Sequence, residues 1–335
     1  MDDRNERAVT LFTLRPTTAA RAASTALLAL LAALVLAGCN GDAQATEVRT
    51  NGAALASTPI TRKVYLVPPP AGVAPIQPIQ TVAPRINARA AIVIDDATGA
   101  VLYEYNSRAR FQPASLTKIA TAALAIDKGK LDQLVTIDNS FDDPSLDDAT
   151  AMGLEPGDKF TLRDLIYGML LPSGADASIA IGRAVSGSDA AFLKEMNAFM
   201  ESLGLYDTHF IDPHGLGGPA HLSTAYDMAM LSRYALRQPL FARAAKTEVY
   251  RANGSRDITL YNTNPWAFGY QGGDGVKSGF TEQAGPTLSA SATRNGHRVI
   301  VVILDSYQRN EDTTALMDWT FNTFCWNDGV LGCKR

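Results

Sequence analysis

The sequence predicts an α/β fold of the α+β kind, in which helices flank one antiparallel sheet. Two β-rich runs stand at the front of the globular part, within residues 90–105, and three stand at its back, within residues 275–305. Helical patterns dominate the stretch between them, residues 115–236. We therefore expect a sheet assembled from both ends of the domain and a helical subdomain formed by the middle of the chain.

The front of the globular part predicts a β-hairpin followed by a buried helix. Residues 90–94 and 101–105 are rich in strand-forming side chains and flank turn-forming residues at 96–99. The segment from Ser115 to about residue 128 is apolar and rich in alanine, which is typical of a buried helix. Pro113 stands just before it, and proline is tolerated in a first helical turn.

The remaining elements follow from periodicity and turn residues. Apolar residues recur at helical spacing in four segments, at 161–171, 175–185, 189–203 and 224–236. Three strand-like runs follow at 275–280, 287–293 and 298–305, separated by turn-forming residues at 283–286 and 294–297. The sequence therefore predicts strands, then helices, then strands.

Length and composition suit one sizeable globular domain with additional segments. The chain has 335 residues, of which 46% are hydrophobic and 19% charged. Its formal net charge of −4 supplies no general attraction to nucleic acid, whose binders usually carry a concentrated basic surface. We expect no nucleic-acid partner.

Residues 1–39 have the layout of a signal peptide with a lipobox. Arg15 and Arg21 precede an uncharged apolar run at residues 22–38. The run closes with Leu36-Ala37-Gly38-Cys39, which resembles the lipobox of bacterial lipoproteins, in which the cysteine carries the lipid. Alternatively, the run stays uncleaved as a transmembrane anchor, since it is near the lower end of the spanning length. Both readings place the rest of the chain outside the cytoplasm, tethered to a membrane.

Residues 40–84 are predicted to be a linker in front of a catalytic domain at 85–335. Its second half is rich in proline, which limits the backbone to extended or polyproline conformations; the prolines are Pro68, Pro69, Pro70, Pro75, Pro78 and Pro84. At about 3 Å per residue, this half would reach on the order of 50 Å. We expect it to hold the domain away from the bilayer.

The sequence gives little support for a metal site. Cys325 and Cys333 are most simply a disulfide that holds the C-terminal tail in an oxidising compartment, because two thiols alone do not complete a zinc site. Four possible ligands crowd into one stretch, namely His209, Asp212, His214 and His221. They lack the helical spacing of zinc peptidases. We expect neither a metal nor another cofactor.

The segment Ser115-Leu116-Thr117-Lys118 places a hydroxyl and an amine three residues apart, on one face of a helix. A serine hydroxyl is a weak nucleophile until a base takes its proton, and a lysine desolvated by apolar neighbours can serve as that base. A nucleophile in the first helical turn also lies near backbone N–H groups and the positive end of the helix dipole. Serine and lysine at this spacing are common on solvated helices, so the pair alone is a weak signal.

Two later segments make the pattern specific. Ser173-Gly174-Ala175 and Lys277-Ser278-Gly279 follow in an order and spacing that resemble the serine D-Ala-D-Ala carboxypeptidases, a family of low-molecular-mass penicillin-binding proteins with motifs S-x-x-K, S-x-N and K-T/S-G. The resemblance runs from about residue 90 to 324 and includes residues 212–216, 223–227 and 262–264. It implies a penicillin-binding protein or β-lactamase-like fold.

The resemblance also implies a role for each motif residue. Ser115 would be the nucleophile, Lys118 its base, and Ser173 a proton relay to the leaving D-alanine. Substrate binding would fall to Lys277, Ser278, Gly279 and Phe280, with the backbone N–H groups of Ser115 and Phe280 as the oxyanion hole. The expected substrates are the D-Ala-D-Ala ends of peptidoglycan stem peptides, and β-lactams are the expected covalent inhibitors.

The chain departs from the family pattern at Ala175, which stands where the second motif has an asparagine. An alanine side chain neither donates nor accepts a hydrogen bond. A missing charge-assisted bond is worth about 1.5–3 kcal/mol, or one to two decades in rate. We therefore expect a slow enzyme rather than an inactive one. Ser278 in place of threonine keeps the hydroxyl and should be nearly neutral.

Two other functions stay open. A serine β-lactamase would need a group that activates water against the acyl-enzyme, and the sequence does not reveal the position of a deacylating glutamate. A non-catalytic module that binds peptidoglycan would have kept the fold and lost the chemistry. Ala175 favours such a module, whereas four residues oppose it, namely Ser115, Lys118, Ser173 and Lys277.

Overall fold

The computed structural model describes residues 81–138, 146 and 149–326. These residues all belong to one compact unit, Thr61–Arg335. The expected signal peptide with Cys39, nearly all of the linker, and Cys333 lie outside the described residues. Among the helices of the described part, none is both long enough and apolar enough to cross a bilayer.

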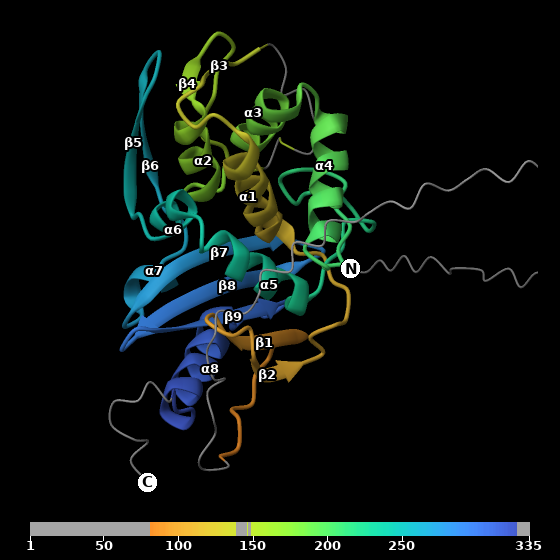
Figure 1. Cartoon of the computed structure of the whole chain (residues 1–335), viewed down its shortest axis with the longest axis vertical. Coiled ribbons are helices and arrows are strands. Elements are labelled where there is room, and N and C mark those ends of the chain that lie inside the picture. Colours follow the sequence, from red (N-terminus) through yellow and green to blue (C-terminus); the bar gives the residue numbers. More distant parts are fainter. Residues whose placement is uncertain (1–80, 139–145, 147–148, 327–335) are drawn as a thin grey trace, which may run out of the picture. The chain divides into compact units, whose positions relative to one another are not determined.

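A five-stranded antiparallel sheet is built from both ends of the domain (Figure 1). Its strands are β1 (Ala90–Asp95), β2 (Val101–Tyr105), β7 (Gly273–Thr281), β8 (Gly285–Arg294) and β9 (His297–Leu304). The strand order is β2-β1-β9-β8-β7, so β1 from the front of the domain pairs with β9 from its back. The predicted hairpin, the three later strands and their union in one sheet are confirmed.

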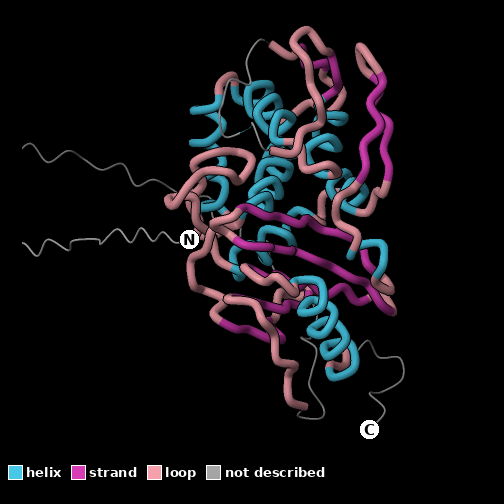
Figure 2. The backbone as a smooth tube through the Cα atoms, turned by 180° about the vertical axis from the view of Figure 1, so that it is seen from behind, coloured by secondary structure: helices cyan, strands magenta, loops and turns pink. Residues whose placement is uncertain are grey.

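Both faces of the sheet are covered, which explains the continuous apolar runs at residues 90–94 of β1 and 299–304 of β9. In β1, Ile92 and Ile94 pack into the core on the side of the helical subdomain. Ala91 and Val93 alternate with them and face the second core, which contains Leu316 of α8 (Arg309–Thr323). Figure 2 shows α8 lying across the sheet on the side opposite the other long helices.

The helical subdomain comes from the middle of the chain, as predicted. The predicted helices are α1 (Lys118–Lys128), α2 (Leu162–Leu170), α3 (Ala175–Ser186), α4 (Asp189–Ser202) and α5 (Ala225–Ala235), and α6 (Pro239–Ala245) follows them without having been predicted. Short polar side chains cap several of them. The Thr161 hydroxyl accepts the backbone N–H of Asp164 at the start of α2, and Thr224 accepts that of Asp227 at the start of α5.

Smaller elements complete the domain. They are the strand pair β3 (Leu134–Thr136) and β4 (Lys159–Thr161), the hairpin β5 (Val249–Asn253) and β6 (Asp257–Tyr261), and the short helix α7 (Trp266–Gly269). The hairpin β5–β6 extends along one side of the helical subdomain (Figure 1).

The helix predicted from Ser115 starts differently. Residues Ala114–Thr117 form a 3₁₀ helix, η2, and α1 begins only at Lys118. Ala114 adopts a positive φ of 50°, which turns the chain sharply after Pro113. Ser115 is therefore held in a tight turn at the base of α1.

Candidate active site

Ser115 and Lys118 face each other at the junction of η2 and α1. The amine Nζ of Lys118 lies 3.0 Å from the Ser115 hydroxyl and 2.8 Å from the backbone carbonyl of His214. The Lys118 residue is 1% exposed and Ser115 is 8% exposed. The serine and lysine that sequence spacing placed on one helical face are thus within hydrogen-bonding distance of each other.

Burial lowers the tendency of the Lys118 amine to carry a proton. Desolvation of the ammonium group is the largest influence and lowers the pKa of Lys118 to about 7, although the charges of Asp212 and Asp176 oppose it. A large fraction of the amine is therefore neutral near pH 7. Such an amine can accept a proton from an adjacent hydroxyl group.

The second motif lies between α2 and α3. Ser173 is buried and has a positive φ of 69°, a strained conformation for a residue other than glycine. Ala175 begins α3, and its backbone N–H donates to the Thr150 carbonyl at 2.9 Å. The Thr150 hydroxyl donates to the Ser173 carbonyl at 3.0 Å. The segment around Thr150 is thus fixed to the second motif.

Asp176 also holds the segment that follows Thr150. This residue was not identified from the sequence. Its buried carboxylate accepts the backbone N–H groups of Met152, Gly153 and Leu154 at 2.8–3.0 Å. Its place in the first turn of α3 was a signal for a role near backbone N–H groups. The partners themselves could not be predicted, because they come from a loop about twenty residues earlier.

The third motif lies on β7, at the edge of the sheet beside η2. Gly279 allows β7 to lie close to η2. A Cβ atom on this residue would stand only 2.9 Å from the Ser115 nitrogen and 2.6 Å from the Thr287 hydroxyl. Lys277 is 2% exposed, and its Nζ donates to the Ser278 carbonyl at 2.9 Å. Burial, and then the charges of Lys118 and Arg309, hold the pKa of Lys277 well below its ordinary value.

The three motifs meet at one cavity of about 300 Å³. The predicted residues that line it are Ser115, Lys118, Ser173, Ala175, Ser278, Gly279 and Phe280. Leu216 and Thr263 also line it and belong to the segments 212–216 and 262–264 that the family resemblance includes, whereas Ala149, Thr150 and Arg309 were not predicted. Lys277 is buried behind this lining. A larger cavity of about 420 Å³ lies between β3 and the junction of α3 with α4, and no motif residue lines it.

Arg309, the first residue of α8, ties that helix to the site. Its guanidinium donates to the backbone carbonyls of Gly279 and Thr287 at 2.6 and 3.1 Å. Burial lowers its pKa from the ordinary value. Sequence reasoning missed this residue because nothing local marks an arginine at a helix start as part of a distant site.

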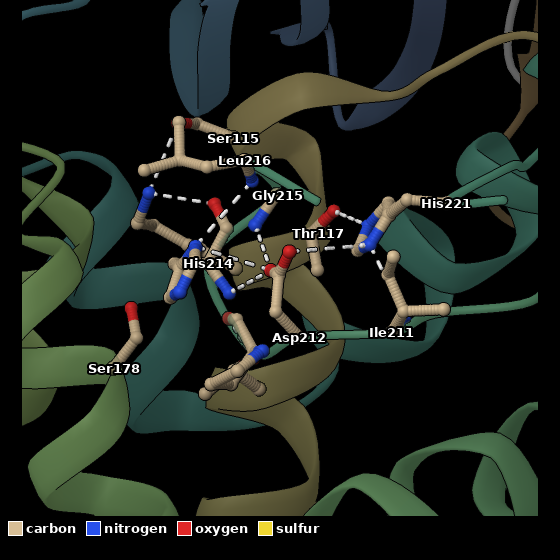
Figure 3. A network of polar contacts seen from close by, with 12 residues as sticks. Ser115, Thr117, Ser178, Ile211, Asp212, His214, Gly215, Leu216 and His221 are labelled. Atoms are coloured by element: carbon tan, nitrogen blue, oxygen red, sulfur yellow. Dashed lines mark hydrogen bonds and ion pairs between the residues drawn. The ribbon is translucent and has the colours of Figure 1, made fainter. Parts of the chain in front are cut away.

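Two of the histidines considered as metal ligands, His214 and His221, take part with Asp212 in a network of polar contacts (Figure 3). Nε2 of His221 lies 2.7 Å from the Thr117 hydroxyl, and Nδ1 accepts the backbone N–H of Ile211 at 3.2 Å. Asp212 accepts the backbone N–H groups of His214 and Gly215. Within the described residues, no group of three or more His, Cys, Asp or Glu side chains is arranged to hold a metal ion.

The sequence profile of a family described as D-alanyl-D-alanine carboxypeptidase matches residues 77–308. The chain belongs to this family. The carboxypeptidase DacF of Bacillus subtilis is 36% identical over 250 residues, which are 71% of this chain and 63% of DacF. DacC of Escherichia coli is 37% identical over 264 residues, which are 73% of this chain and 64% of DacC. This chain therefore spans just under two thirds of the length of these relatives.

A solved structure supports the same assignment of the fold. The crystal structure of the Streptomyces K15 DD-transpeptidase superposes with a TM-score of 0.69 at 32% sequence identity, covering 72% of this chain and all of that one. This member of the D-alanyl-D-alanine carboxypeptidase family thus has a penicillin-binding protein fold, as the resemblance of its motifs implied.

The cysteines of this family member are only partly within the described residues. Cys325 is disulfide-bonded. Its expected partner Cys333 and the expected lipidation site Cys39 lie outside the described residues. The pairing of Cys325 with Cys333 and the lipidation of Cys39 stay predictions.

Proposed function

We propose that this chain is a serine-type D-Ala-D-Ala carboxypeptidase that trims peptidoglycan stem peptides through an acyl-enzyme. The observation that carries the proposal is the buried Lys118 amine, 3.0 Å from the Ser115 hydroxyl and open to the cavity. A buried amine with a lowered pKa and an adjacent hydroxyl group form the minimal machinery of nucleophilic acyl transfer. No cofactor enters this proposal.

The proposed acylation step uses one residue from each motif. Neutral Lys118 takes the Ser115 proton as the serine oxygen attacks the carbonyl carbon of the penultimate D-alanine. The backbone N–H groups of Ser115 and Phe280 stabilise the oxyanion that forms. The peptide bond then breaks, and the proton reaches the leaving D-alanine amine through Ser173.

The second step is hydrolysis of the ester on Ser115. A water molecule attacks the ester carbonyl carbon, Lys118 takes its proton, and the shortened peptide leaves while Ser115 regains its hydroxyl hydrogen. Lys277 and Ser278 orient the terminal carboxylate of the substrate during acylation. The arrival of this carboxylate favours the protonated form of Lys277 and so offsets the effect of burial.

Intact-mass analysis of the purified full-length chain after exposure to a β-lactam tests the proposal. We expect a mass increase equal to one β-lactam on the wild type and none on Ser115→Ala. We also expect the wild type to release D-alanine from a peptide ending in D-Ala-D-Ala. A folded wild-type chain that shows neither reaction would rule the proposal out.

Ala175 favours a second candidate function, a non-catalytic module that binds peptidoglycan. Binding of stem peptides without β-lactam labelling or D-alanine release would decide for the module. A serine β-lactamase-like hydrolase would instead turn over β-lactams rapidly and leave no stable adduct. The mass experiment, followed over time, therefore separates the three functions.

We propose further that the domain works outside the cytoplasm, tethered to a membrane by a lipid on Cys39 or by an uncleaved run at residues 22–38. The basic flank, apolar run and lipobox-like ending support this location. In the same labelling experiment on fractionated cells, the labelled chain should appear with the membranes. If Cys39→Ser releases the labelled chain from the membranes, the lipid is the anchor; if the variant stays with the membranes, the apolar run is the anchor. Finding the labelled wild-type chain only in the cytoplasm would contradict the proposed location.

A further inference from the structure

Asp212 lies in the same turn as His214, whose backbone carbonyl accepts the Lys118 amine (Figure 3). Its side chain is 13% exposed. One carboxylate oxygen, Oδ1, accepts the backbone N–H of His214 at 2.8 Å and also that of Gly215. The other, Oδ2, has no hydrogen-bond partner among the described residues and lies 3.6 Å from Nδ1 of His221. The carboxylate thus holds its own turn through Oδ1, while Oδ2 accepts no hydrogen bond from the described residues.

The turn that Asp212 closes, residues 212–217, is pressed against η2. A Cβ atom on Gly215, whose φ is +93°, would collide with the Ala114 carbonyl oxygen. The Thr121 hydroxyl of α1 donates to the Pro213 carbonyl at 2.6 Å. From this turn the carbonyl of His214 accepts the Lys118 amine at 2.8 Å. The position of the amine therefore depends on the shape of the turn.

The space around the carboxylate is kept free by a second glycine. A Cβ atom on Gly217 would collide with Oδ2 of Asp212. The turn thus carries one glycine that lets it approach η2 and another that leaves room for an anion. A side chain at position 217 would therefore force the Asp212 carboxylate to move.

The surrounding groups leave Asp212 negatively charged. Burial disfavours its charge, but His214, His221 and the two backbone N–H groups outweigh burial and hold the pKa of Asp212 below its ordinary value. His221 is neutral near pH 7, because burial lowers its pKa to about 4. The other charged or titratable groups nearby are Asp176 of α3, which also acts on Lys118, Lys277 of β7, and His209 beside His221.

We propose that Asp212 is a positioning residue of the active site: it holds the turn whose His214 carbonyl anchors the Lys118 amine, and it places a negative charge in that same turn. The proposal rests on the proposed function of Lys118 as the base. Two separable effects follow, because the turn sets where the amine lies and the charge sets the pH at which the amine gives up its proton.

The variant Asp212→Asn separates the two effects, since an asparagine oxygen still accepts the two N–H groups but carries no charge. A nearby anion stabilises the ammonium form, so its removal shifts the titration of Lys118 downward. We expect the midpoint to fall by about half a pH unit or more from the wild-type value near 7. The readout is NMR of full-length chain carrying ¹³C at the lysine Cε, with Lys118 assigned through Lys118→Met.

The same shift should appear in the reaction. The acid limb of the pH profile of β-lactam acylation should move to lower pH in Asp212→Asn, whereas exposed Asp132→Asn should leave both readouts unchanged. Thr121→Val loses the hydroxyl bond to Pro213 at 2.6 Å and a longer contact to the sulfur of Met196 at 3.7 Å, but no charge. We therefore expect it to slow acylation at least threefold at every pH without moving the acid limb.

Three results would overturn the inference: an unchanged or upward shift of the Lys118 titration in folded Asp212→Asn, an acid limb that stays in place despite that shift, or an unaltered acylation rate in Thr121→Val. The NMR titration needs no substrate. If the wild type fails to acylate while Lys118 titrates as expected, the proposed function fails and the charge effect of Asp212 still stands.

Discussion

At the scale of single residues, Ala175 is the clearest departure from the motifs of the family. Its methyl group lines the cavity, close to the wall formed by Thr150 and Ser173. Lys118 makes hydrogen bonds to Ser115 and to the His214 carbonyl, and the ammonium form that arises when it takes the Ser115 proton has three hydrogens to donate. The site therefore has both the space and the spare hydrogen-bonding capacity for a carboxamide.

We predict that Ala175→Asn raises kcat/KM for D-alanine release by about tenfold or more, since a hydrogen bond to a charged group is worth about 1.5–3 kcal/mol. The measurement is D-alanine release at pH 7 from a peptide ending in D-Ala-D-Ala. Ala175→Leu is the matched control, because leucine is close to asparagine in size but makes no hydrogen bond. Equal or lower activity in a folded Ala175→Asn would mean that the site has adapted to alanine.

The motif residues could be predicted from the sequence, whereas their supporting residues could not. Ser115 and Lys118 are three positions apart, so helical geometry alone brings them together. Asp176 and Arg309 act on backbone groups in loops and strands that are distant in sequence. Their partners are set by tertiary packing, and one sequence carries no local signal for such contacts.

At the scale of elements, the site depends on the close approach of β7 to η2. Gly279 is in contact with both the Ser115 backbone and Thr287 of β8. Arg309 of α8 holds the Gly279 carbonyl from the other side. A strand, a 3₁₀ turn and a helix therefore converge on one residue that has no side chain.

We predict that Gly279→Ala slows β-lactam acylation of Ser115 at least a hundredfold, because the new methyl group would push β7 away from η2 and so separate the Ser115 and Phe280 nitrogens proposed to bind the oxyanion. Gly269→Ala is the control, since Gly269 is exposed in α7 and has open space around it. Acylation can be followed by fluorescent penicillin labelling. A Gly279→Ala variant that is labelled at the wild-type rate would show that the contact is not needed.

Two of the elements that the sequence did not predict, α8 and the hairpin β5–β6, have a weak apolar pattern. The buried face of α8 consists of three threonines together with Asp312, Leu316 and Met317. The hairpin β5–β6 buries only Ala252 and Leu260. By contrast, β9 is fully apolar from Val299 to Leu304 and was predicted correctly. Hydrophobic periodicity thus detects elements that bury apolar faces and misses those that bury polar faces or stay at the surface.

At the scale of the whole molecule, the helical subdomain and the sheet edge enclose two lysine side chains at their boundary. Lys118 comes from the subdomain and Lys277 from β7, and both are nearly inaccessible to solvent. Burial lowers the pKa of both lysines, and the charge of Lys118 lowers the pKa of Lys277 further. Folding therefore removes two ammonium groups from water, and this cost depends on pH.

We predict that the free energy of unfolding rises between about pH 7 and pH 10. In this range the unfolded chain keeps the proton on Lys118, whose ordinary pKa is 10.5, while the folded chain, with a pKa of about 7, has released it. Because the unfolded state binds more protons, stability increases with pH by about 1.4 kcal/mol per unit for each such lysine. Burial also raises the pKa of Tyr250 and Tyr270, which reverses the trend above about pH 10.

Urea unfolding at several pH values between 7.5 and 9.5 measures this slope. Lys118→Met should lower it by about 1.4 kcal/mol per pH unit, because one buried titrating amine is gone. Lys130→Met, which removes an exposed lysine, should leave it unchanged. If Lys118→Met keeps the wild-type slope, Lys118 stays protonated in the folded chain and could not act as the base for Ser115. The same titration therefore tests the origin of the pH dependence and the chemistry of the site together.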